Sequence, residues 1–141
     1  TYILSDTMEN IYILYGSQYG NSKSVAESVK EMLESKSIES SIRTLNSAKN
    51  INLKKSKLII VSSTAGNGDP PDNAYDFWRL IKNKTIDKTY FSDVDYMVLA
   101  LGDTNYSYFC QFGKNIDMRL NELGGNRLLP LHCIDDATSP E

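Results

Sequence analysis

Three polar segments, each placed directly after an apolar run, hold the residues best suited to chemistry. The first reads "GSQYGNS" (residues 16–22) and leads into a helical pattern. Glycines let the backbone approach a ligand closely, and the free N–H groups and dipole of a helix N-terminus attract an anion. Ser17, Asn21 and Ser22 could add side-chain hydrogen bonds. The segment therefore predicts a phosphate cradle, with an ordinary N-capped turn as the alternative.

A nucleotide-triphosphatase loop fits this segment poorly. Lys23-Ser24 follows it, and Asp103 stands after an apolar run as an acid of such an enzyme would. The motif GxxxxGK[ST], however, needs a glycine immediately before its lysine, and Ser22 occupies that position. The spacing therefore argues against this class.

The second and third segments suit a planar ligand. In "STAGNGD" (63–69), Gly66 and Gly68 do not complete a dinucleotide motif, because Pro71 stands where its third glycine belongs. A rigid turn of this kind suits a flat ligand edge laid against peptide groups, although it could be an ordinary tight turn. In "GDTNYSYFC" (102–110), Tyr106 could stack on a ring, or it and its aromatic neighbours could fold back onto the core. Together the three segments predict a mononucleotide with a large flat ring.

These segments must be positioned by alternating strands and helices. Strands are expected at residues 11–15, 41–45, 58–62 and 96–101, and at 127–134, where Pro130 favours an edge strand. Three helical patterns carry apolar residues on one face: Val25, Val29, Met32 and Leu33; Ala74, Phe77, Trp78 and Ile81; Phe112, Ile116, Leu120 and Leu123.

Strand followed by helix in this order predicts an α/β fold with a doubly wound parallel sheet. Gly124 stands where a left-handed residue would end the third helix, and residues 46–57 are too polar to assign but could hold a short helix. Ligands of such sheets bind beyond the carboxyl ends of the strands, so the three polar segments should converge. A doubly wound sheet is expected to have one more covering helix after the fifth run, so either that last helix is lacking and the sheet edge is bare, or the domain continues past Glu141.

Length and composition limit the function classes. The 141 residues suffice for one domain, expected at residues 11–141 with residues 1–10 as an N-terminal extension or remnant and Met8 as a candidate native start. No apolar stretch approaches the ~20 residues of a membrane span, and no signal-peptide pattern opens the chain. Cys110 and Cys133 form no CxxC pair, which favours a reducing, cytoplasmic setting.

The charge is uneven along the chain. Residues 1–68 carry 8 Lys/Arg against 6 Asp/Glu, whereas residues 69–141 carry 7 against 12. An acidic half argues against nucleic acid. It is compatible with a basic protein partner, or with a surface that serves solubility alone.

Three stretches carry a family resemblance. "YGSQYGNSKSVAE", "STAGNGDPPDNAYDFW" and "ALGDTNYSYFCQFGKNIDMRLNELGG" resemble the FMN-binding, flavodoxin-like domain of the diflavin reductases. That group includes methionine synthase reductase, the cytosolic iron–sulfur-assembly reductase and microsomal NADPH–cytochrome reductase. The resemblance covers residues 11–136 and implies a five-stranded sheet in the order 2-1-3-4-5.

The resemblance also implies a set of FMN-binding residues. The phosphate would be held by Ser17, Gln18, Tyr19, Gly20, Asn21 and Ser22. One side of the isoalloxazine ring would be lined by Ser63, Thr64, Ala65 and Gly66, with the Gly66 peptide near flavin N5. The other side would be wrapped by Leu101, Gly102, Asp103, Thr104, Asn105, Tyr106, Tyr108, Phe109 and Cys110, with Tyr106 stacked on the ring and Asp136 nearby.

Two positions depart from the family pattern. Tyr19 stands where family members often carry a small hydroxyl residue, and Ala65 stands where the microsomal enzyme has an aromatic residue. Loss of one stacking contact would weaken flavin binding by about 1 kcal/mol.

The function implied is electron transfer within an NADPH-dependent diflavin oxidoreductase. FMN would receive electrons from a FAD and NADPH module, expected in the same polypeptide, and pass them singly to a redox protein acceptor. Such a domain needs no catalytic side chain and no metal of its own. A stand-alone flavodoxin is the alternative. A response-regulator-like signalling domain, which shares the strand order, would need acidic residues after the first and third strands that this chain lacks.

Overall fold

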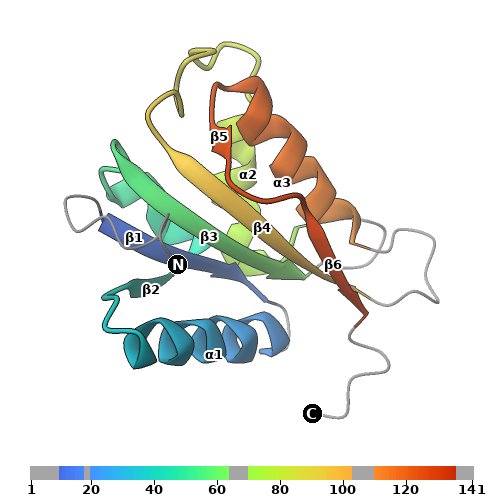
Figure 1. Cartoon of the computed structure of the whole chain (residues 1–141). Helices are drawn as coiled ribbons and strands as arrows, with labels where there is room; N and C mark the ends of the chain where they lie inside the picture. Colours follow the sequence, from blue (N-terminus) through green and yellow to red (C-terminus); the bar gives the residue numbers. More distant parts are fainter. Residues whose placement is uncertain (1–9, 18–19, 64–69, 103–109, 136–141) are drawn as a thin grey trace.

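The chain folds into a parallel sheet with helices on both faces (Figure 1). The computed structural model describes residues 10–17, 20–63, 70–102 and 110–135. The strands are β1 (Asn10–Gly16), β2 (Ser41–Thr44), β3 (Ser56–Ser63), β4 (Asp95–Gly102), β5 (Asn126–Arg127) and β6 (His132–Asp135). The α-helices are α1 (Asn21–Ser35), α2 (Tyr75–Lys82) and α3 (Gln111–Glu122), and the short 3₁₀ helices are η2 (Leu45–Asn50) and η3 (Asp72–Ala74).

The strand order is β2-β1-β3-β4-β5, with β6 also paired to β4, and every pairing is parallel. This confirms the doubly wound fold and its 2-1-3-4-5 order. The fifth expected strand is split in two. β5 pairs with the start of β4 and β6 with its end, and Pro130 lies in the interval, where its missing N–H leaves no ladder bond to make.

Two hydrophobic clusters lie on opposite faces of the sheet. α1 covers one face, where Leu33 and Ala26 pack with Ile13, Ile59 and Val61. α2, α3 and η2 cover the other face, around Leu14, Ile60, Phe77, Ile116 and Leu120 (Figure 1). The three helical patterns are therefore confirmed, and η2 is the short helix allowed for in residues 46–57.

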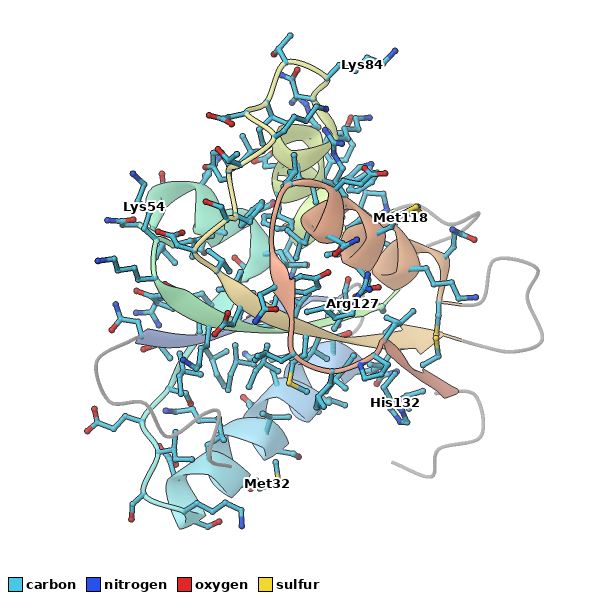
Figure 2. All side chains as sticks on the ribbon, turned by 45° about the horizontal axis from the view of Figure 1, so that its top comes forward. Met32, Lys54, Lys84, Met118, Arg127 and His132 are labelled. Atoms are coloured by element: carbon cyan, nitrogen blue, oxygen red, sulfur yellow. The ribbon has the colours of Figure 1, made fainter. Side chains whose placement is uncertain are left out.

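Met32 is the exception within those patterns. Its side chain is 53% exposed on the outer side of α1, whereas its neighbour Leu33 is buried (Figure 2). Only one side of α1 faces the sheet, so Leu33 reaches the sheet and Met32 does not.

Two glycines fix the position of α3. A Cβ on Gly113 would stand 2.3 Å from the Ala100 Cβ, so α3 packs directly against β4. Gly124 has φ 91° and ends the helix as expected. Its N–H donates to the Asn121 carbonyl, and the Gly125 N–H donates to the Leu120 carbonyl, which is a Schellman motif.

An ion pair attaches the β5 strand to α3. Arg127 contacts the carboxylate of Asp117 through Nη2 at 2.9 Å and Nε at 3.1 Å, and the guanidinium lies 6.0 Å from the centre of the Tyr96 ring. The Tyr96 hydroxyl donates to the Asp117 carbonyl. Burial first, and then the nearby Asp117, raises the pKa of Tyr96.

No helix within the described part of the chain is long and apolar enough to cross a membrane.

Candidate functional site

The carboxyl ends of β1, β3 and β4 meet at one edge of the sheet. Gly16 pairs with Ser62, and Ser63 pairs with Leu101 in the register of the three strands. Side chains reinforce this edge, because the Ser63 hydroxyl donates to the Gly16 carbonyl at 3.4 Å. The described ends of the three polar segments thus converge, as the sequence predicted.

The first segment forms the N-terminal approach to α1. Gly20 immediately precedes the helix with φ 98°, a left-handed conformation that L side chains rarely adopt. A Cβ there would meet nothing within 4 Å, so the backbone conformation is the reason for the glycine. The Gly20 N–H donates to the Ser17 hydroxyl oxygen at 2.6 Å, and the Ser24 N–H donates to the Gly20 carbonyl at 3.0 Å.

This arrangement leaves donors available for an anion. The first N–H groups of α1 have no carbonyl within the helix to bond. The Ser17 hydroxyl accepts from Gly20 through its oxygen, so its own proton is free to donate elsewhere. Of the other expected phosphate contacts, Asn21 is exposed and Ser22 is fully buried.

Ser22 has an unusual environment. Its hydroxyl oxygen is buried and has no hydrogen-bond partner among the residues that the structure describes. A buried hydroxyl without a partner costs free energy. At the N-terminus of a helix, a bound anion would supply the missing acceptor.

Asn73 joins the first segment to η3. The Ser17 N–H donates to the Asn73 Oδ1 at 2.9 Å, a contact between residues 56 positions apart. Asn73 is not among the residues that the sequence predicts for the site, although it lies within the family-like stretch "STAGNGDPPDNAYDFW". A hydrogen bond over this sequence separation leaves no local spacing signal.

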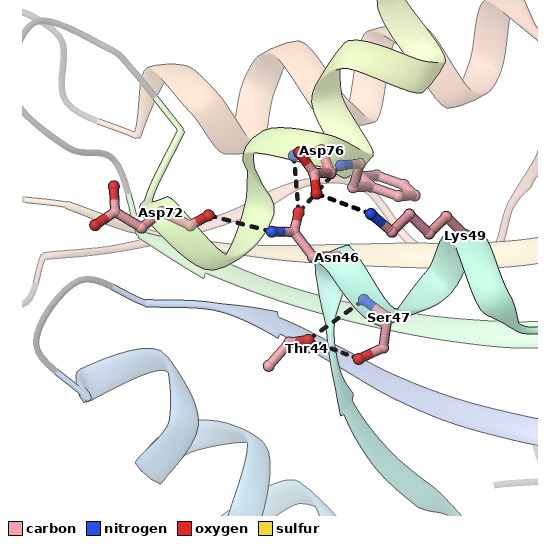
Figure 3. A network of polar contacts seen from close by, with 7 residues as sticks. Thr44, Asn46, Ser47, Lys49, Asp72 and Asp76 are labelled. Carbon is pink, nitrogen blue, oxygen red and sulfur yellow. Dashed lines mark hydrogen bonds and ion pairs between the residues drawn. The ribbon is translucent and has the colours of Figure 1, made fainter.

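The start of α2 is held by a side chain from η2 (Figure 3). The Asn46 Oδ1 accepts from the N–H groups of Asp76 and Phe77 at 2.8 and 3.1 Å, and its Nδ2 donates to the Asp72 carbonyl at 3.2 Å. Lys49 pairs with Asp76 at 2.9 Å. We call Asn46, Lys49, Asp72 and Asp76 the Asn46 network.

The described residues in and beside the third segment, Leu101, Gly102 and Cys110, offer backbone and few side-chain atoms to a ligand. Leu101 is buried and packs within the α1-side cluster, and Gly102 is also buried. Cys110, just before α3, is buried with φ 57°, and its thiol donates to the Ala100 carbonyl at 3.3 Å. The thiol is thus bonded to the β4 backbone, and burial is the main cause that raises its pKa to about 12.

The other expected site residues lie outside the described residues: Gln18, Tyr19, Thr64, Ala65, Gly66, Asp103, Thr104, Asn105, Tyr106, Tyr108, Phe109 and Asp136. Within the described ranges, no group of three or more His, Cys, Asp or Glu side chains is arranged to hold a metal ion.

The chain resembles known proteins over nearly its whole length. A family model described as flavodoxin matches residues 13–141. The sulfite reductase [NADPH] flavoprotein alpha-component of Bacillus subtilis (strain 168) is 42% identical over 134 residues, which are 94% of this chain and 22% of that protein. Methionine synthase reductase of Mus musculus is 38% identical over 136 residues, which are 95% of this chain and 20% of that protein.

The chain therefore spans about a fifth of the length of these curated relatives. NADPH-dependent diflavin oxidoreductase 1 of Danio rerio is 35% identical over 127 residues, 89% of this chain and 21% of that protein. These relatives confirm the resemblance to the diflavin reductases that the three quoted stretches indicated.

Solved structures agree on the fold. A flavodoxin from Pseudomonas aeruginosa, solved as a mutant with serine in place of a cysteine, has a TM-score of 0.76 at 26% identity, covering 93% of this chain and 87% of that one. Oxidised flavodoxin 2 from Bacillus cereus has a TM-score of 0.73 at 26% identity, covering 89% of this chain and 84% of that one.

Proposed function

This chain belongs to the flavodoxin family, and from that premise we propose that it binds FMN as the electron-transfer domain of an NADPH-dependent diflavin reductase. The observation that carries the proposal is the buried Ser22 hydroxyl, without a partner among the described residues, at the N-terminus of α1. Hydrogen-bond donors and a positive helix end fit the phosphate of FMN. The residues present therefore suit this cofactor.

When bound, FMN supplies the redox chemistry, because it can take up a pair of electrons and release them one at a time. The chain's own residues bind and orient the cofactor. Ser17, Gly20 and Ser22 would hold the phosphate, together with Asn21 and the expected Gln18 and Tyr19. The ends of β3 and β4 would direct the second and third segments to the two sides of the ring.

We assign those two segments the roles that the resemblance implies. Thr64, Ala65 and Gly66 continue from Ser63 on one side. On the other side, residues 103–109 continue from Leu101 and Gly102, with Tyr106 as the stacking residue and Asp136 near the ring. Cys110 contributes through its backbone in this proposal, because its thiol is bonded to Ala100.

The partners proposed are those that the family resemblance implies, and the NADPH and diflavin in the names of two relatives support them. A FAD and NADPH module would deliver electrons, and a redox protein of unassigned identity would accept them. We also propose residues 11–141 as the FMN domain, with residues 1–10 preceding it. We propose a cytoplasmic location, since free thiols at Cys110 and Cys133 suit a reducing compartment.

A stand-alone flavodoxin is the second candidate, and the structural similarity to two flavodoxins supports it. The sequence favours the reductases, because the curated relatives named above are 35–42% identical whereas those two flavodoxins are 26% identical. A gene that encodes FAD and NADPH modules beside this domain would support the first candidate, and a gene without them the second.

Titration with two flavins tests the phosphate cradle. Ser22→Ala should weaken FMN binding about tenfold to a hundredfold, because a hydrogen bond to a charged group is worth about 1.5–3 kcal/mol. Riboflavin has the same ring without the phosphate, so its affinity should change little. Flavin fluorescence quenching measures both dissociation constants.

Ser28→Ala is the matched control, because Ser28 is an exposed serine of the same helix. It should leave both affinities unchanged. Equal losses for FMN and riboflavin in Ser22→Ala would contradict a phosphate contact.

A further inference from the structure

Asn73 contacts the phosphate segment from a different part of the chain. Its Oδ1 accepts the Ser17 N–H at 2.9 Å, and Ser17 is the first residue after β1. The Asn73 side chain is half-buried, which protects this bond from competition with water. The orientation of the Gly16–Ser17 peptide is therefore set by Asn73, a residue outside the phosphate segment.

The position of Asn73 is itself fixed by hydrogen bonds within and around η3. Asn73 is the central residue of η3, whose single turn is closed by the Ala74 N–H donating to the Pro71 carbonyl at 2.9 Å. The Asn46 network holds the first residue of η3 through the Asp72 carbonyl and the following turn through Asp76 (Figure 3).

η3 also packs directly against the end of β1. A Cβ on Gly16 would stand 2.9 Å from the Ala74 Cβ and 3.0 Å from the Ser62 Oγ. Gly16 therefore allows η3 to approach β1 closely enough for Asn73 to reach the next residue, Ser17. The hydrogen bond between Asn73 and Ser17 thus joins η3 to the end of β1, and each of these elements is also held by other interactions.

We propose that Asn73 is a positioning residue for the phosphate of the cofactor, an inference that rests on the proposed function. By holding the Ser17 N–H, Asn73 fixes the Ser17 hydroxyl where it accepts from Gly20 and keeps its own proton available. Preorganisation of this kind lowers the entropy cost of binding. Asn73 itself does not touch the phosphate in this arrangement.

The test compares three variants. Asn73→Ala removes the acceptor, and Asn73→Asp retains an oxygen acceptor for the same N–H. Asn83→Ala is the matched control, because the Asn83 Oδ1 also accepts a backbone N–H at 2.9 Å, from Thr85, just beyond the far end of α2. Two readouts are used: amide hydrogen exchange at Ser17 in the protein without flavin, and the affinities for FMN and riboflavin.

Asn73→Ala should speed exchange of the Ser17 amide at least about tenfold and weaken FMN binding about tenfold. Riboflavin affinity should stay within about twofold. Asn73→Asp should restore slow exchange at Ser17, and Asn83→Ala should change neither readout. A fall of FMN and riboflavin affinity by the same factor would assign Asn73 a merely structural role.

The proposal is overturned if Asn73→Ala leaves Ser17 exchange and the FMN-to-riboflavin affinity ratio as in the unmodified protein. It is also overturned if Asn73→Asp exchanges as fast as Asn73→Ala. Failure of the proposed function has a different signature: the unmodified, folded protein would then bind FMN no better than riboflavin, whatever the exchange data show.

Discussion

At the scale of single residues, the direction of each hydrogen bond decides what the cradle can hold. Ser17 uses its N–H on Asn73 and its oxygen on the Gly20 N–H, so only its hydroxyl proton remains to donate. Ser22 keeps its buried hydroxyl without a partner among the described residues. Both hydroxyls can therefore donate to an acceptor, and a phosphate presents several.

Cys110 is a residue whose ionisation should govern stability in alkaline solution. Folding raises the pKa of this thiol from 9.0 to about 12, chiefly by burial and then by the neighbouring Cys133. The neutral thiol is favoured in the folded protein, so its stabilising contribution is complete below about pH 9. It is lost as the pH rises from 9 towards 12, because the unfolded chain ionises first.

We expect the free energy of unfolding to fall between pH 8 and pH 11 by about 1–3 kcal/mol more in the unmodified protein than in Cys110→Ala. Urea unfolding at both pH values, with a reducing agent present, measures the difference. Tyr96, whose pKa is also raised, is present in both proteins and cancels. An identical fall in the two proteins would show that Cys110 does not contribute.

At the scale of elements, the N-terminus of α2 is capped by a residue of another element, Asn46 of η2. Ala74 precedes the helix and has no side chain able to cap it, yet the Asp76 and Phe77 N–H groups both bond the Asn46 Oδ1. These are the second and third helical N–H groups, which a local cap would normally satisfy. Asn46 thereby joins η2, η3 and α2 on one face of the sheet (Figure 3).

Asn46→Ala should therefore destabilise the protein by about 1–3 kcal/mol, the cost of leaving capping groups unsatisfied. Asn52→Ala is a suitable comparison, because among the described residues the Asn52 Oδ1 accepts only from the local, exposed Lys54 N–H. It should cost about 0.5 kcal/mol or less. Equal unfolding midpoints in urea for the two variants would contradict a capping role for Asn46.

Local sequence patterns predicted the elements well, and the reason is physical. Continuous apolar runs and 3.6-residue periodicity depend only on neighbouring residues, as does the left-handed ending at Gly124. The Asn46 cap and the Asn73 contact depend on segments 30 and 56 positions apart. Nothing in the local spacing could predict them. The sequence indicates that Pro130 interrupts the fifth strand. The result, two short strands that both pair with β4, is known only from the register of the sheet.

The candidate site likewise combines features that the local sequence indicates with features that only the tertiary structure shows. The sequence predicts Gly20, Ser17 and Ser22 as phosphate contacts, since they stand directly before or at the start of a helical pattern, and this assignment stays a prediction. The role of Cys110 was not predictable, because only the packing of α3 against β4 shows that its thiol bonds the Ala100 carbonyl.

At the scale of the whole molecule, the parallel sheet gives the binding edge its charge. α1, α2 and α3 each follow the carboxyl end of a strand, so all three helices begin at the same edge of the sheet (Figure 1). The N-terminal end of a helix carries about half a positive charge. The edge therefore favours a phosphate even though residues 69–141 are acidic overall.

The proposed binding of the phosphate and the proposed electron transfer by the ring take place at different parts of this edge. In the proposed arrangement the phosphate would bind at the start of α1, while the ring would lie between the segments that follow β3 and β4. A protein partner that exchanges electrons with the ring would therefore approach the carboxyl edge of the sheet.

FMN binding by this protein can be tested with an absorbance spectrum of the purified protein. The protein should be yellow, as isolated or after FMN is added and the excess removed. Mass spectrometry should then find FMN released on heating, at about one per chain. A folded protein that stays colourless and leaves added FMN free in solution would show that this chain does not bind FMN.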